Sequence, residues 1–192
     1  FVLLLISNSL FADEASNWLK GEVDYILNAY KNDNLTNTER FNYIEDTINN
    51  NFTGAGIAKF VAGQAWAMAN KETKKEYINI FKRHLALNIA SLMQGYSDQE
   101  YSLINSIFDE SNDISLIDME IKNNSSSMLV TWRVKKSKDR FFVIDLLVAD
   151  ISLVVTKRSE FNSSLKKIDY DLQTFNEILH NQNELSYNKI IQ

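Results

Sequence analysis

The stretch from Arg140 to Lys166 constrains the fold more than any other part of the chain. Phe141 to Val148 is an almost unbroken apolar run with one acid, Asp145, in its middle. A run of this length, rich in Val, Ile and Leu, is typical of a strand that is buried on both faces or that faces a cavity. A second apolar run, Ile151 to Val155, follows without Pro or Gly, and the residues after it have helical spacing: Phe161, Leu165 and Ile168. The stretch therefore predicts a strand, a bend, a short strand and an amphipathic helix that leaves the sheet.

Helical periodicity dominates the first half of the chain. Apolar residues on one face predict a helix over Ala15–Lys31, and the pair Thr36–Glu39 has the spacing of a capping box that begins a second helix. A short apolar helix is expected to end at Gly63. Asn70 is placed to cap a long helix over Lys71–Gly95.

The pattern then changes from helix to strand. Short or alternating apolar runs predict three further strands, over Tyr101–Asn105, Ser115–Lys122 and Ser127–Val134. Two hairpin loops are expected between strands, over Asn123–Ser126 and Lys135–Asp139. A last amphipathic helix is expected over Tyr170–Leu179. This order predicts an α+β domain over residues 13–180, with helices packed on a curved four-stranded antiparallel sheet, and a polar tail over residues 181–192.

The composition excludes several classes of function. A net charge of −5 lacks the basic face that a nucleic-acid footprint needs. Zero cysteines exclude disulfides, thiolate metal sites and cysteine nucleophiles. His84 and His180 have no companion ligand pattern, so both are interpreted as surface or helix-edge residues and no metal site is expected. Because the sequence also lacks hydrolase, zinc-protease and P-loop motifs, it predicts a protein that is not an enzyme and needs no cofactor.

The N-terminus is typical of an export signal. Phe1 to Ile6 is an apolar run, and a patch of small residues ends at Ala12, before the acidic pair Asp13-Glu14. Residues 1–12 thus resemble the end of a secretory signal peptide, and they are too few to span a bilayer. The alternative is a buried N-terminal strand or helix. We expect a soluble, exported protein.

Two blocks of the chain resemble the MlaC (toluene-tolerance) family. The first block, residues 52–93, reads FTGAGIAKFVAGQAWAMANKETKKEYINIFKRHLALNIASLM and is similar to the family's helix pair, with its FVLGRYW motif. The second block, residues 141–167, reads FFVIDLLVADISLVVTKRSEFNSSLKK and is similar to the family signature WKVYDVVVEGVSLVxNYRSQF. Phe141 stands where the signature has Trp, and Ala149-Asp150 stands where it has Glu-Gly.

The resemblance implies a periplasmic phospholipid carrier with an NTF2-like or MlaC-like fold. Such a carrier holds acyl chains in a hydrophobic pocket between sheet and helices, and shuttles lipid between the outer and inner membranes to maintain outer-membrane asymmetry. The implied partners of this monomer are an inner-membrane MCE-domain ABC transporter and an outer-membrane lipoprotein–porin complex. Two alternatives stay open: a cone-fold isomerase or hydrolase with Asp145 as its base, and a carrier of another hydrophobic ligand, such as a quinone.

A lipid pocket needs apolar side chains, because each shielded CH₂ contributes about 0.8 kcal/mol. The candidates on the strands are Val130, Trp132, Phe142, Ile144, Leu146 and Val148. The candidates on the helices are Phe60, Phe81, Leu85 and Ile89. Each of these residues could instead belong to the ordinary core. Lys157 and Arg158 begin the helix after the sheet, where they suit a headgroup rim, a partner-docking contact or a solvated helix start.

Overall fold

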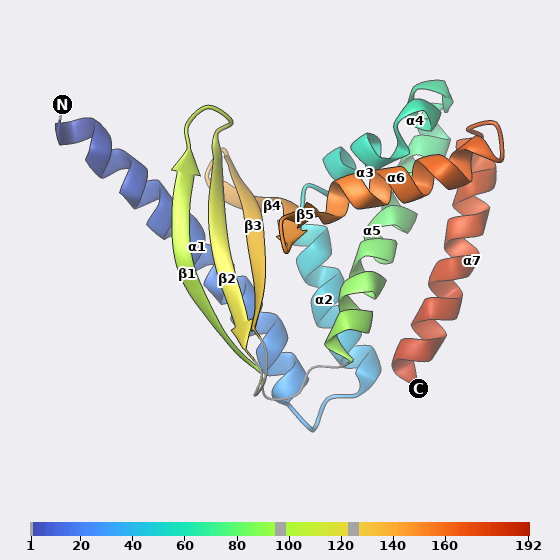
Figure 1. Ribbon diagram of the computed structural model, residues 1–192. Helices are drawn as coiled ribbons and strands as arrows, with labels where there is room; N and C mark the ends of the chain where they lie inside the picture. The colour runs from blue at the N-terminus through green and yellow to red at the C-terminus, as the bar shows by residue number, and fades with distance from the viewer. Residues whose placement is uncertain (1, 95–98, 123–126) are drawn as a thin grey trace. The chain divides into compact units, whose positions relative to one another are not determined.

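The computed structural model describes residues 2–94, 99–122 and 127–192, with the backbone alone for residues 2–13. In this part of the chain the elements follow the order shown in Figure 1. They are α1 (Val2–Lys31), α2 (Asn37–Asn51), α3 (Gly54–Ala62), α4 (Gln64–Met68), α5 (Lys71–Met93), β1 (Glu100–Asp109), β2 (Ile114–Lys122), β3 (Ser127–Ser137), β4 (Arg140–Val148), β5 (Ile151–Ser152), α6 (Leu153–Lys166) and α7 (Leu172–Ile191). The predicted α+β architecture is confirmed.

The chain divides into two compact units. The sheet unit comprises Phe1–Tyr25 and Ser97–Leu153, and the helical unit comprises Ile26–Tyr96 and Val154–Gln192. Each unit has a hydrophobic core of its own.

The sheet unit is an antiparallel sheet in the order β1-β2-β3-β4-β5, with α1 lying across one face (Figure 1). The short β5 is the short strand predicted after Phe141–Val148, and it extends the expected four-stranded sheet to five strands. Ala15 and Leu19 of α1 are buried with Ile117 of β2 and Val134 of β3, and these residues form the core of the unit. Because successive side chains of a strand point to opposite faces, Ile117 and Val134 lie on the face that α1 covers.

Two polar contacts fix the course of α1 over the sheet. Near the end of β3, Lys136 Nζ donates to the Glu14 carboxylate at 2.8 Å. Near the start of β1, the Tyr101 hydroxyl donates to the Asp24 carboxylate at 2.5 Å. Because these two points lie at opposite ends of the sheet and on different strands, α1 crosses the sheet diagonally.

In the helical unit, α2, α3 and α7 pack around α5. One core joins α3, α5, α6 and α7 through Ile57, Val61, Tyr77, Phe81, Phe161, Leu165, Leu172, Phe175 and Leu179. A second core joins α2, α5 and α7 through Phe41, Ile44, Ile48, Ala86, Leu87, Ala90 and Ile190.

Local capping signals begin two of these helices. The capping box of α2 is confirmed: Glu39 N–H donates to the Thr36 hydroxyl at 3.2 Å, and Thr36 N–H donates to the Glu39 carboxylate at 2.8 Å. The predicted cap of α5 is also confirmed, because the Asn70 side chain accepts from Thr73 N–H at 2.9 Å. Such bonds satisfy donors that a helix start otherwise leaves unpaired.

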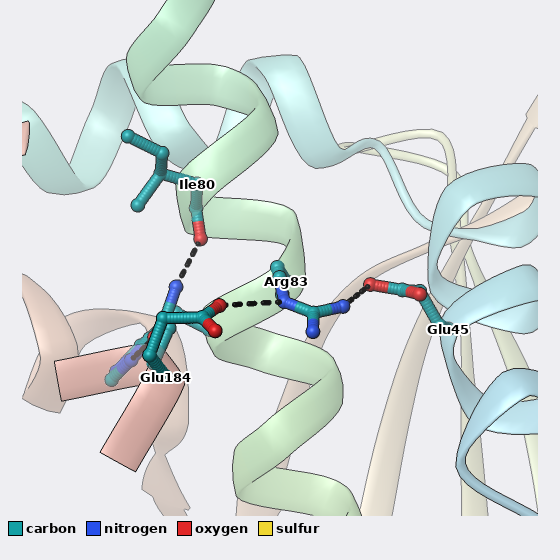
Figure 2. A network of polar contacts seen from close by, with 6 residues as sticks. Glu45, Ile80, Arg83 and Glu184 are labelled. Atoms are coloured by element: carbon teal, nitrogen blue, oxygen red, sulfur yellow. Dashed lines mark hydrogen bonds and ion pairs between the residues drawn. The ribbon is translucent and has the colours of Figure 1, made fainter. Parts of the chain in front are cut away.

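Two buried asparagines fix the register between α5 and α7. The Asn176 amide donates to the Thr73 carbonyl at 3.2 Å, and the Asn183 amide donates to the Ile80 carbonyl at 2.9 Å, as Figure 2 shows for Ile80. Both pairs are 103 residues apart in sequence, so the two helices run parallel. Buried polar groups of this kind need their partners, so a shift of one helix along the other would cost these two hydrogen bonds.

Arg83 of α5 ties three helices together (Figure 2). Its guanidinium lies 2.8 Å from the Glu45 carboxylate of α2 and 3.9 Å from the Glu184 carboxylate of α7. It also lies over the rings of Phe41 and Tyr187, at 5.4 and 4.6 Å from their centroids. The planar cation thus combines ion pairing with stacking between helices.

Several predicted boundaries differ from the structure. β3 continues to Ser137, which reduces the predicted Lys135–Asp139 loop to a two-residue turn. The predicted strand Ile151–Val155 was too long, because β5 has two residues and α6 begins at Leu153. The predicted loop Asn123–Ser126 lies outside the described residues.

The first and last elements that the structure describes are helices, α1 from Val2 and α7 to Ile191. The last helix was predicted to end at Leu179, but α7 continues to Ile191, and Asn183 and Ile190 are buried against the other helices. At the other end, residues 2–12 are continuous with the rest of α1. The assignment of residues 1–12 to a signal peptide stays a prediction.

Candidate functional site

Four of the predicted lipid-binding residues form one apolar block on the sheet. Val130 pairs with Val148 across β3 and β4, and Trp132 pairs with Leu146 in the same register. Trp132 also pairs with Ile117, which α1 covers, so the whole block lies on the α1 face of the sheet. Val130 is 3% exposed and the other three are half-buried. The block extends along β3 and β4 as far as Val148, which pairs with Ile151 of β5.

The other two strand candidates do not join this block. A bulge at Arg133/Val134 shifts the register of β4, so Phe142 pairs with Lys135 and points to the opposite face from Leu146. The guanidinium of Arg140 lies 5.1 Å from the Phe142 ring centroid on that face. Ile144 falls in the bulge itself. Phe142 and Ile144 therefore do not lie on the α1 face with Leu146 and Val148, because the bulge interrupts the alternation of side chains along β4. A lipid contact of these two residues stays a prediction.

The four helical candidates differ in burial. Phe81 is fully buried in the first core of the helical unit, with its ring 5.9 Å from that of Phe161. Leu85 packs against both cores of this unit and Ile89 against the second. Phe60 is 42% exposed on α3. The core alternative describes Phe81 well, and a ligand role for these four residues stays a prediction.

Arg158 stabilises the contact between α6 and α3. Its Nη1 donates to the Phe60 carbonyl at 3.0 Å, and its guanidinium lies 4.4 Å from the centroid of the Phe60 ring. The carbonyl belongs to the last turn of α3, where the helix dipole favours a cation. Lys157 forms an ion pair with Glu160, one turn along α6, at 2.8 Å. No sequence signal links Arg158 with Phe60, because 98 residues separate them.

Asp145 joins β4 to β5. Its carboxylate accepts from the Ser152 hydroxyl at 2.7 Å and from Leu146 N–H at 2.8 Å, and it lies 3.6 Å from Arg133 Nη1. The residue is 7% exposed. Both Asp145 and Ser152 occupy matching positions of the family signature, so this part of the signature specifies structure. A carboxylate engaged in this way is a poor general base.

His84 is half-buried in the helical unit, which corrects the expectation of a surface or helix-edge residue. The Asn183 amide nitrogen already donates to a carbonyl, so its oxygen faces His84 Nδ1 at 3.0 Å and accepts the ring N–H. His84 Nε2 is buried without a hydrogen-bond partner among the described residues. Burial lowers the pKa of His84 to about 4, against the smaller, opposing effect of the Asn183 hydrogen bond.

In the described ranges, no cluster of three or more His, Asp or Glu side chains could hold a metal ion. No described helix combines the length and the apolar character that a membrane span requires.

The fold is thus that of a small α+β protein whose candidate site is an apolar sheet face. A sequence model of the MlaC protein family matches residues 20–179, and the chain therefore belongs to the MlaC family. This family comprises lipid carriers, so the chain is not an enzyme and the cone-fold enzyme alternative is wrong.

A solved structure supports the same fold. The chain is similar to the phospholipid-binding protein of Ralstonia solanacearum, which was solved in complex with a phospholipid. The TM-score is 0.76 at 17% sequence identity, over 90% of this chain and 98% of that one. No curated protein matches the sequence.

Proposed function

We propose that the chain is a periplasmic phospholipid carrier. The observation that carries the proposal is the MlaC family match over residues 20–179. The fold supports it, because the similar Ralstonia solanacearum protein was solved with a bound phospholipid. In this proposal the protein shuttles phospholipid between the outer and inner membranes and so maintains the lipid asymmetry of the outer membrane.

The apolar block supplies a surface for the acyl chains. Shielding ten methylene groups from water contributes about 8 kcal/mol, which corresponds to roughly micromolar affinity before ordering costs. Val130, Trp132, Leu146 and Val148 are the strand residues that we assign to this contact. They offer aliphatic and aromatic carbon on one face of the sheet, which is the chemistry that acyl chains require.

To carry lipid between the two membranes, the protein must be exported to the periplasm and must bind a partner at each membrane. Residues 1–12 are assigned to the signal that directs the protein to the periplasm. The partners are the inner-membrane MCE-domain ABC transporter and the outer-membrane lipoprotein–porin complex, which a monomeric carrier visits in turn. The exposed Arg158 and its neighbour Lys157 are candidates for these contacts, since charged surface residues raise the rate of encounter more than the lifetime of a complex.

Native mass spectrometry of freshly purified protein tests the function directly. We expect the protein to carry phospholipid at about one molecule per chain, because a lipid that leaves the protein must expose its acyl chains to water. Organic extraction of the same sample identifies the lipid class. A protein that is folded by circular dichroism and yields no lipid would contradict the proposal. A bound quinone or other apolar ligand would show that the protein carries a ligand other than phospholipid.

A further inference from the structure

Trp132 carries a polar group that its apolar surroundings do not satisfy. Its indole N–H is buried, and no hydrogen-bond acceptor for it lies among the described residues. Native proteins rarely leave a buried donor unpaired, because losing its hydration without a new partner is unfavourable. The indole nitrogens of Trp18 and Trp66 are not in this condition. The unpaired donor thus marks Trp132 out from the other two tryptophans.

The position of Trp132 indicates what its partner is. Its ring packs against the core beneath α1, while its cross-strand neighbour Leu146 belongs to the apolar block. Val130 and Val148 complete the block one residue pair further along the strands. A ligand that lies on the block is therefore next to the Trp132 side chain, and it can supply the acceptor that the enclosed N–H lacks once the surrounding side chains give way. Within the block itself every other side chain is a hydrocarbon.

We propose that Trp132 is a specificity-determining residue that donates a hydrogen bond from its indole N–H to an ester carbonyl oxygen of the bound lipid. This inference rests on the proposed phospholipid function. A neutral donor among hydrocarbon side chains suits the neutral carbonyl at the head of an acyl chain. The lipid phosphate fits less well, because burying an anion without a paired cation is strongly unfavourable. The bond fixes how far the acyl chain extends along the block.

The proposal predicts that the protein distinguishes phospholipids with ester carbonyl groups from phospholipids without them. A diester phospholipid has the carbonyl acceptor, and a diether phospholipid of the same chain length and headgroup lacks it. From the strength of one neutral hydrogen bond, the wild-type protein should bind the diester about three- to tenfold more tightly. Trp132→Phe keeps a ring in the block and removes the donor, so this preference should fall to near one. Trp66→Phe, whose ring lies 5.6 Å from Lys74 Nζ in the helical unit, is the control and should retain the preference.

A second measurement uses only the wild-type protein in its lipid-bound state. The three tryptophans give three indole N–H signals in a ¹H–¹⁵N spectrum, which the two Phe variants assign. Loading the wild-type protein with diester lipid should shift the Trp132 proton signal downfield, and diether lipid should not. Equal affinities for the two lipids, with no difference in the Trp132 signal, would overturn the role of Trp132 and leave the carrier function intact. Failure to bind either lipid would instead overturn the proposed function.

Discussion

At the scale of the residue, the two glycines at the start of α3 have different environments. A Cβ on Gly54 would lie 2.5 Å from Lys82 Cε and 2.8 Å from Lys82 Cγ, so the Lys82 stem must move. That stem carries Nζ to the Asn49 carbonyl at 3.4 Å, near the end of α2. A Cβ on Gly56 would have only ordinary contacts, at 3.8 Å or more, with Thr53.

The two alanine variants should therefore change stability in opposite directions. Gly54→Ala should lower the free energy of unfolding by about 1–3 kcal/mol through overpacking. Gly56→Ala should raise it by up to about 1 kcal/mol, because alanine is the better helix former at an exposed helical position. Urea denaturation of both variants measures the difference. Equal stabilisation of the two would show that Lys82 yields freely.

His84 makes stability depend on pH. Its pKa is about 4 in the folded protein, against 6.5 for an unperturbed histidine, so the folded state resists a proton that the unfolded state accepts. Above pH 6.5 neither state binds the proton and the effect vanishes. Below that value the free energy of unfolding should fall, by about 2 kcal/mol between pH 7 and pH 5. His84→Gln should remove this part of the pH dependence while keeping an amide that can bond with Asn183.

The measurement is urea denaturation at pH 7 and pH 5. His180→Gln, at an exposed position of α7, is the matched control and should behave as the wild type does. An identical loss of stability in wild type and His84→Gln would mean that His84 is protonated or solvated in the folded state.

At the scale of the element, the β4–β5 hairpin turns through residues that suit it poorly. Ala149 and Asp150 have φ angles of 47° and 63°, the pattern of a two-residue turn with both residues in the left-handed region. Gly and Asn favour such a turn, whereas alanine there costs about 1 kcal/mol. The family signature has Gly at the position of Asp150. This chain keeps the turn because the Asp145–Ser152 hydrogen bond holds the two strands together.

Asp150→Gly should stabilise the protein by about 0.5–1 kcal/mol, because glycine adopts the positive φ without strain. Asp139→Gly is the matched control in the two-residue turn between β3 and β4, where only the preceding residue, Lys138, has a positive φ. That control should destabilise the protein slightly, since it adds freedom to the unfolded chain alone. Thermal unfolding compares the two. Stabilisation by both or by neither would show that backbone strain at Asp150 is unimportant.

At the scale of the whole molecule, sequence patterns between near neighbours predicted the helices and strands. The strand register and the contacts between helices depend on residues far apart in the sequence. The Thr36–Glu39 capping box and the Asn70 cap were visible in the sequence, because each depends on residues three apart. The bulge opposite Arg133 and the contact of Arg158 with Phe60 were not, because they depend on strand register and on residues far apart in sequence. For the same reason the sequence could not show that Phe142 lies on the opposite face of the sheet from Leu146.

The extent of α7 illustrates the same limit. Residues 181–192 have too polar a composition to predict a helix, yet Asn183 is buried because its amide finds the Ile80 carbonyl. This hydrogen bond depends on how α7 is aligned with α5, and the spacing of apolar residues in the sequence does not predict that alignment. The apolar block, in contrast, was largely predictable. Val130, Trp132, Leu146 and Val148 lie on strands whose alternation is undisturbed on that side of the bulge.

The central claim is that phospholipid lies on the α1 face of the sheet, and two adjacent leucines of β4 test it. Leu146 belongs to the apolar block, whereas Leu147 pairs with Thr131 and Ser152 on the opposite face. Both are half-buried, so Leu147→Asp is a matched control for placing a charge on this strand. The measurement is phospholipid bound per folded chain, by native mass spectrometry of Leu146→Asp and Leu147→Asp. We expect Leu146→Asp to lose its lipid, because a charge against acyl chains costs several kcal/mol, and Leu147→Asp to keep it. Full lipid occupancy in folded Leu146→Asp, or loss confined to Leu147→Asp, would contradict the claim.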